Sequence, residues 1–292
     1  MKYKYLLGGF TIASDLHFPE LVQSLDDADV TISLGKVSEH LATNDVGFPF
    51  IEANEFQYLL RLPNIGRYLV ENGTSVTIQP DDCALIGDVK NYVLTAIFGA
   101  LSCQRNFLPM HGGAILVDGK AYLILGNSGV GKSTLLSSLN QMGYKVITDD
   151  ISNIKIVNGQ PVLYPSFPRI MIWKDTLAKM QIDNTTLVRV RSDMEKYFLQ
   201  IDDTDFTTPV EIYKIFVLVN RKVEDALEVK GFNKINLLKN NIFHPWMINA
   251  FKKHISINEQ IMVLSSKVTV ERFYNNLSAD MKFNVEEFIK RI

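Results

Sequence analysis

The sequence predicts an α/β protein in which helices cover a core of mixed β-sheet, preceded by a smaller β-rich N-terminal module. Two observations carry this prediction. A glycine-rich loop, residues 126–134, stands between a short apolar run at 121–125 and an amphipathic segment with leucines on one face. A second apolar run, 144–148, follows within one helix and ends in two aspartates. Two strands that are joined through a single helix in this way run parallel in one sheet.

The first 88 residues are predicted to form the β-rich module, and residues 89–292 the larger domain that carries the loop. Residues 74–78 alternate polar and apolar side chains after the turn signal Asn72-Gly73, which indicates a strand. The aromatic and aliphatic run 56–62 is expected to pair with that strand. The module shows no set of catalytic residues, so we expect it to be structural or to face a partner.

A helix is expected over residues 89–107, because apolar residues recur there about once per turn, and Pro109 is expected to end it. The dipeptide Asp118-Gly119 then predicts a two-residue hairpin. Counted back from that turn, the register places His111 opposite Gly126, the first residue of the loop. The hairpin is therefore expected to bring a histidine to the mouth of the loop.

Further elements follow the second apolar run. Residues 151–157 and 161–164 are predicted to be strands around an Asn-Gly turn, and 212–220 a third strand, from their apolar and β-branched side chains. Residues 237–253 and 270–292 are predicted to be helical.

The glycine-rich loop fits the pattern G-x-x-x-x-G-K-[ST], which cradles phosphate groups. Its backbone N–H groups and the N-terminus of the following helix attract negative charge. Lys132 is expected to reach the β- and γ-phosphates of a nucleotide, and the Ser133 hydroxyl to ligate Mg²⁺. We therefore predict ATP and Mg²⁺ as cofactors, with a nucleotide-binding loop of Gly126, Asn127, Ser128, Gly129, Val130, Gly131, Lys132, Ser133 and Thr134.

Asp149 and Asp150 are expected at the strand end beside the loop, because the carboxyl ends of parallel strands share one edge of a sheet. One carboxylate should join Ser133 on Mg²⁺, which prefers oxygen ligands. The other can accept the proton of an attacking hydroxyl. His111 has three open roles, which are to orient the acceptor, to bind phosphate, or to tune the two aspartates.

Four basic residues are candidates for contact with phosphate or an acidic substrate. Arg169 follows a stiff proline-containing stretch, and its planar guanidinium suits a triphosphate or an acidic peptide end. Arg189, Arg191 and Lys196 lie in a polar segment, 181–205, which is expected to face the substrate and to close over the nucleotide.

The composition argues against several classes of protein. The net charge of −2 gives no reason to expect a nucleic-acid or membrane surface. Cys83 and Cys103 show neither metal-ligand spacing nor a disulfide framework, so a reducing cytoplasm is the expected location. No apolar run approaches the roughly 18 residues of a membrane span.

The order Met110-His111-Gly112, then the loop, then Thr148-Asp149-Asp150 resembles the core of the HPr kinase/phosphorylase superfamily. That family shares its nucleotide fold with ATP-dependent phosphoenolpyruvate (PEP) carboxykinase, so the resemblance implies a PEP carboxykinase-like P-loop core. It also implies that one aspartate acts as base toward a serine hydroxyl while the other helps to hold the metal. The catalytic residues that it implies here are His111, Lys132, Asp149 and Asp150.

The match itself does not decide which aspartate has which role. We assign Asp149 as the base, and Asp150 with Ser133 as the metal ligands.

The whole layout is similar to HPr-kinase-like proteins found beside lasso-peptide biosynthesis genes, which phosphorylate the C-terminal serine of a precursor peptide. Residues 8–16 and 165–173 support this finer resemblance. Thr134 departs from HPr kinase itself, which usually has an acidic residue there, and a later Glu- and glycine-rich signature is missing. The departure argues against HPr as substrate and against the reverse phosphorylase activity.

The sequence thus predicts an ATP- and Mg²⁺-dependent serine kinase acting on a ribosomal precursor peptide, with no nucleic-acid or membrane partner. A small-molecule hydroxyl kinase and a non-catalytic ATP-sensing scaffold stay open as alternatives. A motor or transport ATPase fits less well, because the acids follow the loop within one short helix and strand. HPr kinase relatives form hexamers, so the resemblance is compatible with a homo-oligomer.

Overall fold

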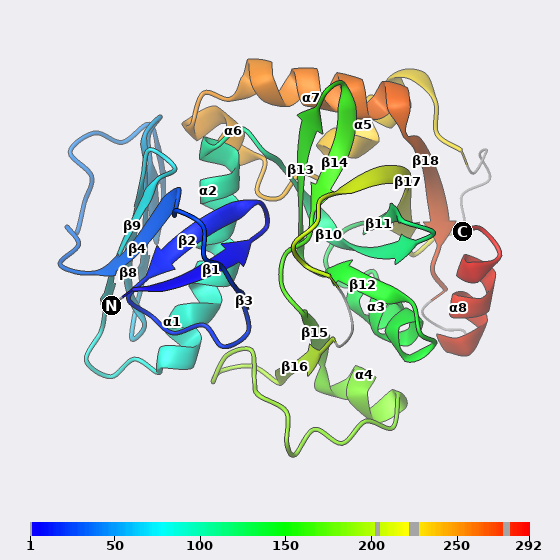
Figure 1. The fold of residues 1–292 in the computed structure, drawn as a ribbon, viewed down its shortest axis with the longest axis horizontal. Helices are drawn as coiled ribbons and strands as arrows, with labels where there is room; N and C mark the ends of the chain where they lie inside the picture. Colours follow the sequence, from blue (N-terminus) through cyan, green and yellow to red (C-terminus); the bar gives the residue numbers. More distant parts are fainter. Residues whose placement is uncertain (1, 202–204, 222–227, 277–280) are drawn as a thin grey trace.

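The computed structural model describes residues 2–201, 205–221, 228–276 and 281–292 (Figure 1). These residues form a mixed α/β fold with several β-sheets, as predicted at this coarse level. A nine-stranded sheet from the first 80 residues lies on one side of the molecule, and a seven-stranded sheet lies on the other (Figure 1). A helical segment between the two large sheets separates them.

The nine-stranded sheet has the strand order β3-β1-β2-β4-β9-β8-β7-β6-β5. The pairs β2–β4 and β4–β9 are parallel, and the other neighbours are antiparallel. Buried and less buried side chains alternate along β2, β8 and β9, so one face of the sheet is apolar. The strands are β1 Tyr3–Leu7, β2 Phe10–Ser14, β3 Val22–Gln23, β4 Val30–Leu34, β5 Val46–Phe48, β6 Ile51–Ala53, β7 Gln57–Leu62, β8 Gly66–Glu71 and β9 Ser75–Pro80.

The two strands predicted at 56–62 and 74–78 are confirmed as β7 and β9, but the pairing expected between them is wrong. Strand β8 lies between them and pairs with both. The reason is local, since Asn64 adopts a left-handed backbone (φ 64°) and returns the chain at once. Strand β7 therefore pairs with β8, the segment that follows its own turn, and β8 pairs in turn with β9.

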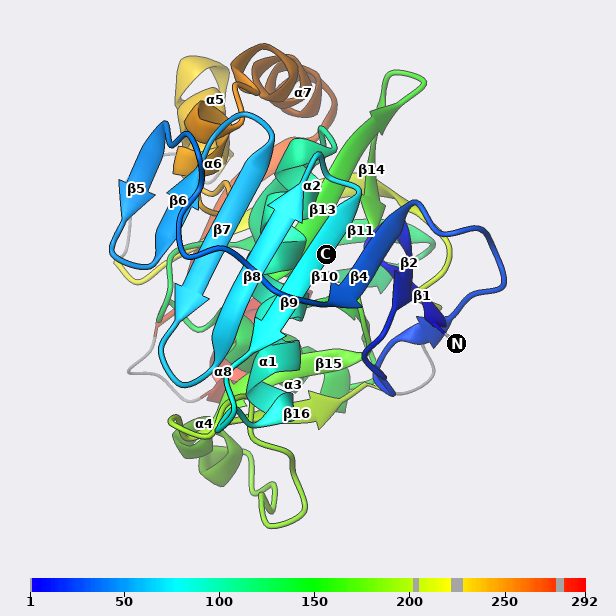
Figure 2. The same cartoon turned by 90° about the vertical axis from the view of Figure 1, so that its left-hand side faces the viewer.

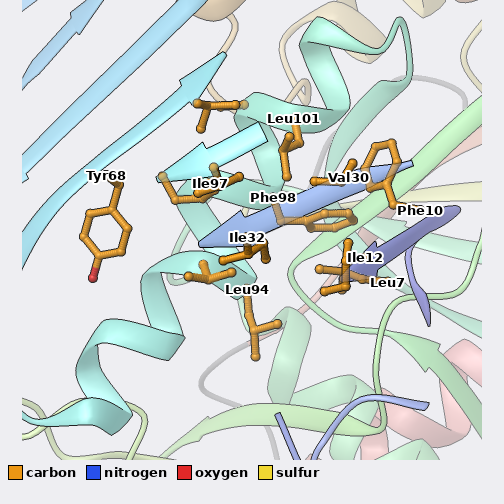
Figure 3. Close-up of a cluster of buried hydrophobic side chains, with 14 of the residues drawn as sticks. Leu7, Phe10, Ile12, Val30, Ile32, Tyr68, Leu94, Ile97, Phe98 and Leu101 are labelled. Carbon is orange, nitrogen blue, oxygen red and sulfur yellow. The ribbon is translucent and has the colours of Figure 1, made fainter. Parts of the chain in front are cut away.

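The predicted helix is confirmed as one continuous helical segment of α1 (Ile86–Tyr92), a π-helical turn η1 (Val93–Ile97) and α2 (Phe98–Gln104). It lies behind the nine-stranded sheet when that sheet faces the viewer (Figure 2). Its buried residues Ile97, Phe98 and Leu101 belong to the same apolar cluster as Phe10 and Val30 of the sheet (Figure 3). The boundary predicted between residues 88 and 89 falls within α1.

The expected end of this helix at Pro109 is wrong. The helix ends at Gln104, and Asn106 then adopts a left-handed backbone (φ 59°) that redirects the chain. Pro109 lies in β10 (Leu108–Val117), opposite Asn153 of the neighbouring strand. Its carbonyl accepts a hydrogen bond from Phe243, so the residue still takes part in the backbone network.

Strand β10 is the centre of the second sheet. It pairs with β11 (Lys120–Leu125) on one side and with β12 (Lys145–Thr148) on the other, antiparallel in both cases. Strands β11 and β12 are therefore parallel to each other, as predicted, although β10 stands between them. Their carboxyl ends meet at one edge, where the glycine-rich loop and the aspartates follow.

The predicted hairpin register is confirmed as far as the pair Gly112–Leu125, beginning at Val117–Lys120. Asp118 and Gly119 both have positive φ, 48° and 74°, as a two-residue turn of this kind requires. One residue further, His111 leaves β11 and pairs with Ile151 instead.

The other predicted strands are also confirmed, and they complete the sheet in the order β11-β10-β13-β14-β17-β18. Strand β11, the first of this path, also pairs in parallel with β17, the last strand but one. Strands β15 and β16 form a separate pair. The bounds are α3 Lys132–Gln141, β13 Ile151–Val157, β14 Gln160–Tyr164, β15 Arg169–Trp173, α4 Lys174–Lys179, β16 Lys196–Gln200 and β17 Val210–Val219.

The C-terminal helices predicted from the sequence are wrong in extent. Residues 237–253 hold the end of α5 (Gly231–Lys239) and all of α6 (Trp246–Ala250), with α7 (His254–Lys267) beginning just after. Residues 270–274 belong to a strand, β18 (Thr269–Tyr274), and α8 (Met281–Ile289) follows. Strand β18 pairs in parallel with β17, and this long-range partner outweighs the helix-like spacing of its apolar residues. Among the described residues, no helix combines the length and apolarity that crossing a membrane requires.

Candidate active site

The glycine-rich loop leads from β11 into the first turn of α3. Gly131 caps the helix in a left-handed conformation (φ 94°), and within the described part of the chain the helix start has no side-chain cap hydrogen bond. The residues of this first turn line a cavity of about 720 Å³, a volume typical of small-molecule sites. The loop thus has the backbone geometry of helix starts that bind anions, and its role in binding phosphate stays a prediction.

Lys132 lies over this loop and is largely buried. Its ammonium group donates to the carbonyl oxygens of Gly126 (2.7 Å) and Asn127 (3.1 Å) and lies 3.2 Å from His111 Nε2. Burial lowers the pKa of Lys132, whereas the charges of Asp150 and Asp149 raise it. A phosphate group at the helix start would be a stronger acceptor than the two carbonyls that the lysine now uses.

Asp149 is 5% exposed, and both of its oxygens accept hydrogen bonds. Ser133 donates its hydroxyl to Oδ1 (2.9 Å), and the backbone N–H of Met171 donates to Oδ2 (2.7 Å). Burial and the charge of Asp150 raise the pKa of Asp149 to about 6, although both hydrogen bonds act in the opposite direction. The carboxylate nearest the loop serine is therefore Asp149, whereas the sequence analysis paired Ser133 with Asp150.

Asp150 is the more open of the two acids, with its side chain 28% exposed. Its Oδ1 lies 3.7 Å from Nδ1 of His111, which is too long for a hydrogen bond. Burial lowers the pKa of His111, the Asp150 charge opposes this, and the Lys132 charge reinforces it. Burial thus favours the neutral ring, in which Nε2 can accept a hydrogen bond from the Lys132 ammonium group.

Glycines after His111 allow the strands to approach closely enough to hold this arrangement. A Cβ on Gly113 would lie 2.5 Å from the Thr148 carbonyl and 2.8 Å from that of Asp149. A Cβ on Gly112 would lie 2.3 Å from the Ile124 carbonyl. The dipeptide thus fixes the distance between the histidine strand and the acid pair.

Of the four predicted cations, Lys196 lines the cavity and the three arginines do not. Arg169 lies 3.7 Å from Glu20, and Arg189 lies 2.5 Å from Glu195. Both arginines thus lie beside acids that are outside the cavity lining, and Arg189 does not reach over the glycine-rich loop as expected.

Arg191 is likewise engaged elsewhere, and it ties its segment to helix α1. It pairs with Asp193 (3.0 Å) and donates to the Tyr92 hydroxyl (2.6 Å). Beside it, Ser192 donates its N–H (3.0 Å) and its hydroxyl (2.6 Å) to the carboxylate of Asp88. The segment that carries Lys196 into the cavity is thus held by a helix of the N-terminal half.

Several cavity residues were missed by the sequence analysis. Trp173, Thr176 and Lys179 come from β15 and α4, and Asn275 and Asn284 come from the C-terminal region. No motif marks them, because they reach the cavity only through the packing of distant elements. Asn275 has a further role, since its Nδ2 donates to the Val130 carbonyl (2.7 Å) and supports the loop.

His244 carries no sequence motif that indicates a functional role. It is exposed, adopts a left-handed backbone (φ 45°), and lies near the site, where Asp150 acts on its charge. Desolvation by the surrounding rings lowers the pKa of His244, and the Asp150 carboxylate opposes that shift.

The donor set fits a magnesium ion that is shared with phosphate groups. Among the described residues there is no cluster of three His, Cys, Asp or Glu side chains that could hold a metal alone. Ser133, Asp149 and Asp150 nevertheless line one cavity and offer only oxygen ligands. Mg²⁺ commonly takes one or two protein oxygens and completes its shell with phosphate and water.

Together, the fold and the site define a mixed α/β protein with a glycine-rich loop, an acid pair and a histidine around one cavity. No family model matches the chain. The HPr kinase/phosphorylase of Clostridium beijerinckii (strain ATCC 51743 / NCIMB 8052) is 31% identical to it over 106 residues, which are 33% of this chain and 34% of that protein. The predicted resemblance to the HPr kinase/phosphorylase superfamily is thereby confirmed, over about a third of the length of either protein.

A solved structure, that of the Hpr(Ser) kinase/phosphatase from Coxiella burnetii, aligns with 63% of this chain and 88% of its own at 14% identity and a TM-score of 0.38. The finer resemblance to lasso-peptide kinases stays a prediction.

Proposed function

We propose that this protein is a kinase that uses Mg-ATP to phosphorylate a serine hydroxyl. One observation carries the proposal, which is that Ser133 and Asp149 are hydrogen-bonded at the helix start while Asp150 and His111 stand open beside Lys132. Phosphoryl transfer needs a phosphate cradle, a metal site and an acceptor-orienting base in one place. All three are offered by a single cavity.

The hydrogen bonds support a division of roles between the aspartates that is opposite to our sequence-based assignment. Asp149 has both oxygens engaged and shares the loop serine, which suits a ligand of the metal or of its water shell. Asp150 has an exposed edge and no strong hydrogen bond to its carboxylate in the described residues, which suits a base that receives a proton. In this proposal Asp150 takes the serine proton, and the neutral His111 orients the acceptor.

Ser133 and Asp149 would hold Mg²⁺, which when bound neutralises charge on the phosphate oxygens. Lys132 would leave the loop carbonyls and bind the β- and γ-phosphates. Lys196 would add a second positive charge at the cavity wall. The first-turn N–H groups of α3 would bind the remaining phosphate oxygens.

The acceptor that we propose is the C-terminal serine of a ribosomal precursor peptide, on the strength of the finer resemblance. The relative is named for HPr, so HPr is the first alternative acceptor to exclude. A small-molecule hydroxyl and a sensor without transfer remain the other two alternatives. The division into a module of residues 1–88 and a catalytic domain of 89–292 also belongs to this proposal.

Mass spectrometry after incubation with Mg-ATP tests the function. The acceptors are precursor peptides with and without the terminal serine, HPr, and free serine. We expect a mass gain of one phosphoryl group on the intact peptide, lost when the serine is removed. Transfer to free serine alone would favour the small-molecule kinase, and bound ATP without any transfer would favour the sensor.

A further inference from the structure

A row of aromatic rings leads from the site to the edge of the nine-stranded sheet. His111 lies 6.1 Å from Phe243 between ring centroids, and Phe243 lies 4.3 Å from His244. His244 lies 6.3 Å from Trp246, which in turn lies 5.1 Å from Phe48. We call the last three of these residues, His244, Trp246 and Phe48, the aromatic strip.

The strip is accessible, unlike the ring that anchors it. Phe243 is buried, whereas His244 is exposed, Trp246 is half-buried and Phe48 is 45% exposed. Phe50, two residues after Phe48, is 50% exposed. Large apolar side chains that gather on a surface beside a site mark a place of contact with another molecule.

The segment that carries the strip is held in place by backbone hydrogen bonds to the active-site strand. The N–H of His111 donates to the Asn241 carbonyl (2.7 Å), and that of Phe243 donates to the Pro109 carbonyl (2.8 Å). His244 keeps its left-handed backbone while its carbonyl accepts the N–H of Met247 (2.9 Å). A histidine in this conformation is uncommon and costs free energy, which its neighbours must offset.

The position of the strip indicates which of the two substrates, acceptor or nucleotide, it would contact. The strip begins at His244, one ring beyond Phe243, and Phe243 is the neighbour of His111 at the cavity, where an acceptor hydroxyl has to arrive in the proposed reaction. Trp173, Thr176 and Val285 also line the cavity but come from other elements than the strip.

We propose that the aromatic strip binds an extended acceptor peptide that carries an apolar or aromatic side chain a few residues from its phosphorylated hydroxyl. This inference rests on the proposed function and names its substrate class. The ring-to-ring path is on the order of 20 Å, which about six extended residues span. A free amino acid or a small alcohol cannot reach Phe48 while its hydroxyl is at Asp150.

The sheet edge next to the strip supports an extended partner. Strand β5, which ends at Phe48, is the last strand of its sheet. Such an edge presents backbone N–H and C=O groups that can pair with an incoming chain, while side-chain contacts supply selectivity.

The test measures binding and transfer separately on the full chain. The probe is a set of fluorescein-labelled synthetic peptides, each with one serine and one phenylalanine at a varied spacing. Their affinity is measured by anisotropy for the wild type, Phe48→Ser and His244→Asn, and transfer is measured with Mg-ATP. Asparagine tolerates a left-handed backbone, so His244→Asn removes the ring and keeps the fold should Phe48→Ser disturb it. The control is Phe56→Ser, since Phe56 is 57% exposed at a turn outside the strip.

We expect one range of spacings to bind best, and both strip variants to weaken that binding about tenfold, as the loss of a buried aromatic contact implies. The control should bind like the wild type. Equal binding by wild type and both strip variants, or no dependence on spacing, would overturn the strip. Spacing-dependent binding without any phosphoryl transfer would overturn the kinase and leave the strip standing.

Discussion

The hydroxyl of Ser133 donates to Asp149 Oδ1 across 2.9 Å, while the other oxygen of Asp149 accepts the Met171 N–H at 2.7 Å. One carboxylate thus joins the helix that follows the phosphate loop to the strand that forms a cavity wall. The cost of burying its charge is partly offset by these two bonds. The neighbouring Asp150 accepts no comparable hydrogen bond from the described residues, and it lines the cavity.

Replacement of each aspartate by asparagine separates their proposed roles. Asp150→Asn removes the proton acceptor, so we expect kcat for phosphoryl transfer to fall by about 10²–10⁴ while Mg-ATP still binds. Asp149→Asn should instead raise the Mg²⁺ concentration needed for half-maximal rate. Kinetics across a magnesium titration, with nucleotide affinity measured by calorimetry, would check this. A normal Mg²⁺ requirement in Asp149→Asn with lost turnover would restore Asp149 as the base.

Asp149→Asn should also stabilise the fold at alkaline pH. The folded pKa of about 6 lies above the ordinary 3.8, so the fold disfavours the ionised carboxylate. The resulting penalty is absent below about pH 4 and complete above about pH 6, where it amounts to about 3 kcal/mol. Asparagine can still accept from Met171 and donate to Ser133. Denaturant unfolding at pH 4 and pH 8 should show a gain at pH 8 alone, and equal gains at both would contradict the electrostatic cause.

Gly113→Ala should disturb the acid pair. The added Cβ would lie 2.4 Å from the Leu136 side chain and 2.5 Å from the Thr148 carbonyl. The backbone of a neighbouring strand cannot move away without a cost in free energy. We expect a loss of about 1–3 kcal/mol in the free energy of unfolding and a matching loss of nucleotide affinity. Gly87→Ala is the control, because no atom lies within 4 Å of the position that its Cβ would take and its helical backbone accepts alanine. Equal stability of the two variants would show that the strands can separate freely.

Replacing the basic residues one at a time shows which of them contribute to nucleotide affinity. Lys196→Met should weaken Mg-ATP binding about tenfold, because it removes a charge from the cavity wall. Arg189→Met should bind within about twofold of the wild type, since Arg189 pairs with Glu195 outside the cavity. Isothermal titration at two salt concentrations would check the pair. The reverse order would mean that the segment rearranges when nucleotide binds.

The parts that sequence predicted well are those set by neighbours along the chain. The Asp118-Gly119 turn fixes its hairpin, and the loop pattern fixes a helix start at Lys132. The wrong predictions concern residues whose structure depends on partners far away in the sequence. Strand β18 owes its conformation to β17, and the three arginines are drawn from the cavity by acids that no local pattern connects to them.

The candidate site shows the same limit. The loop, His111 and the aspartates could be placed together from one hairpin and one crossover, because few residues separate them. His244 lies more than ninety positions downstream of the aspartates, and the residues just before it, Asn241 and Phe243, form backbone hydrogen bonds with β10. The choice between the aspartates also lay beyond the sequence, since two adjacent carboxylates differ only in what surrounds them.

The hydrogen bonds from Ser192 to Asp88 couple helix α1 to the segment that carries Lys196 into the cavity. If a nucleotide draws Lys196 inward, the strain passes through residues 189–193 to a helix that is packed on the nine-stranded sheet. Linkage is reciprocal, so whatever displaces α1 must change nucleotide affinity by the same factor. A molecule that binds the nine-stranded sheet and displaces α1 would therefore change nucleotide affinity without contacting the glycine-rich loop.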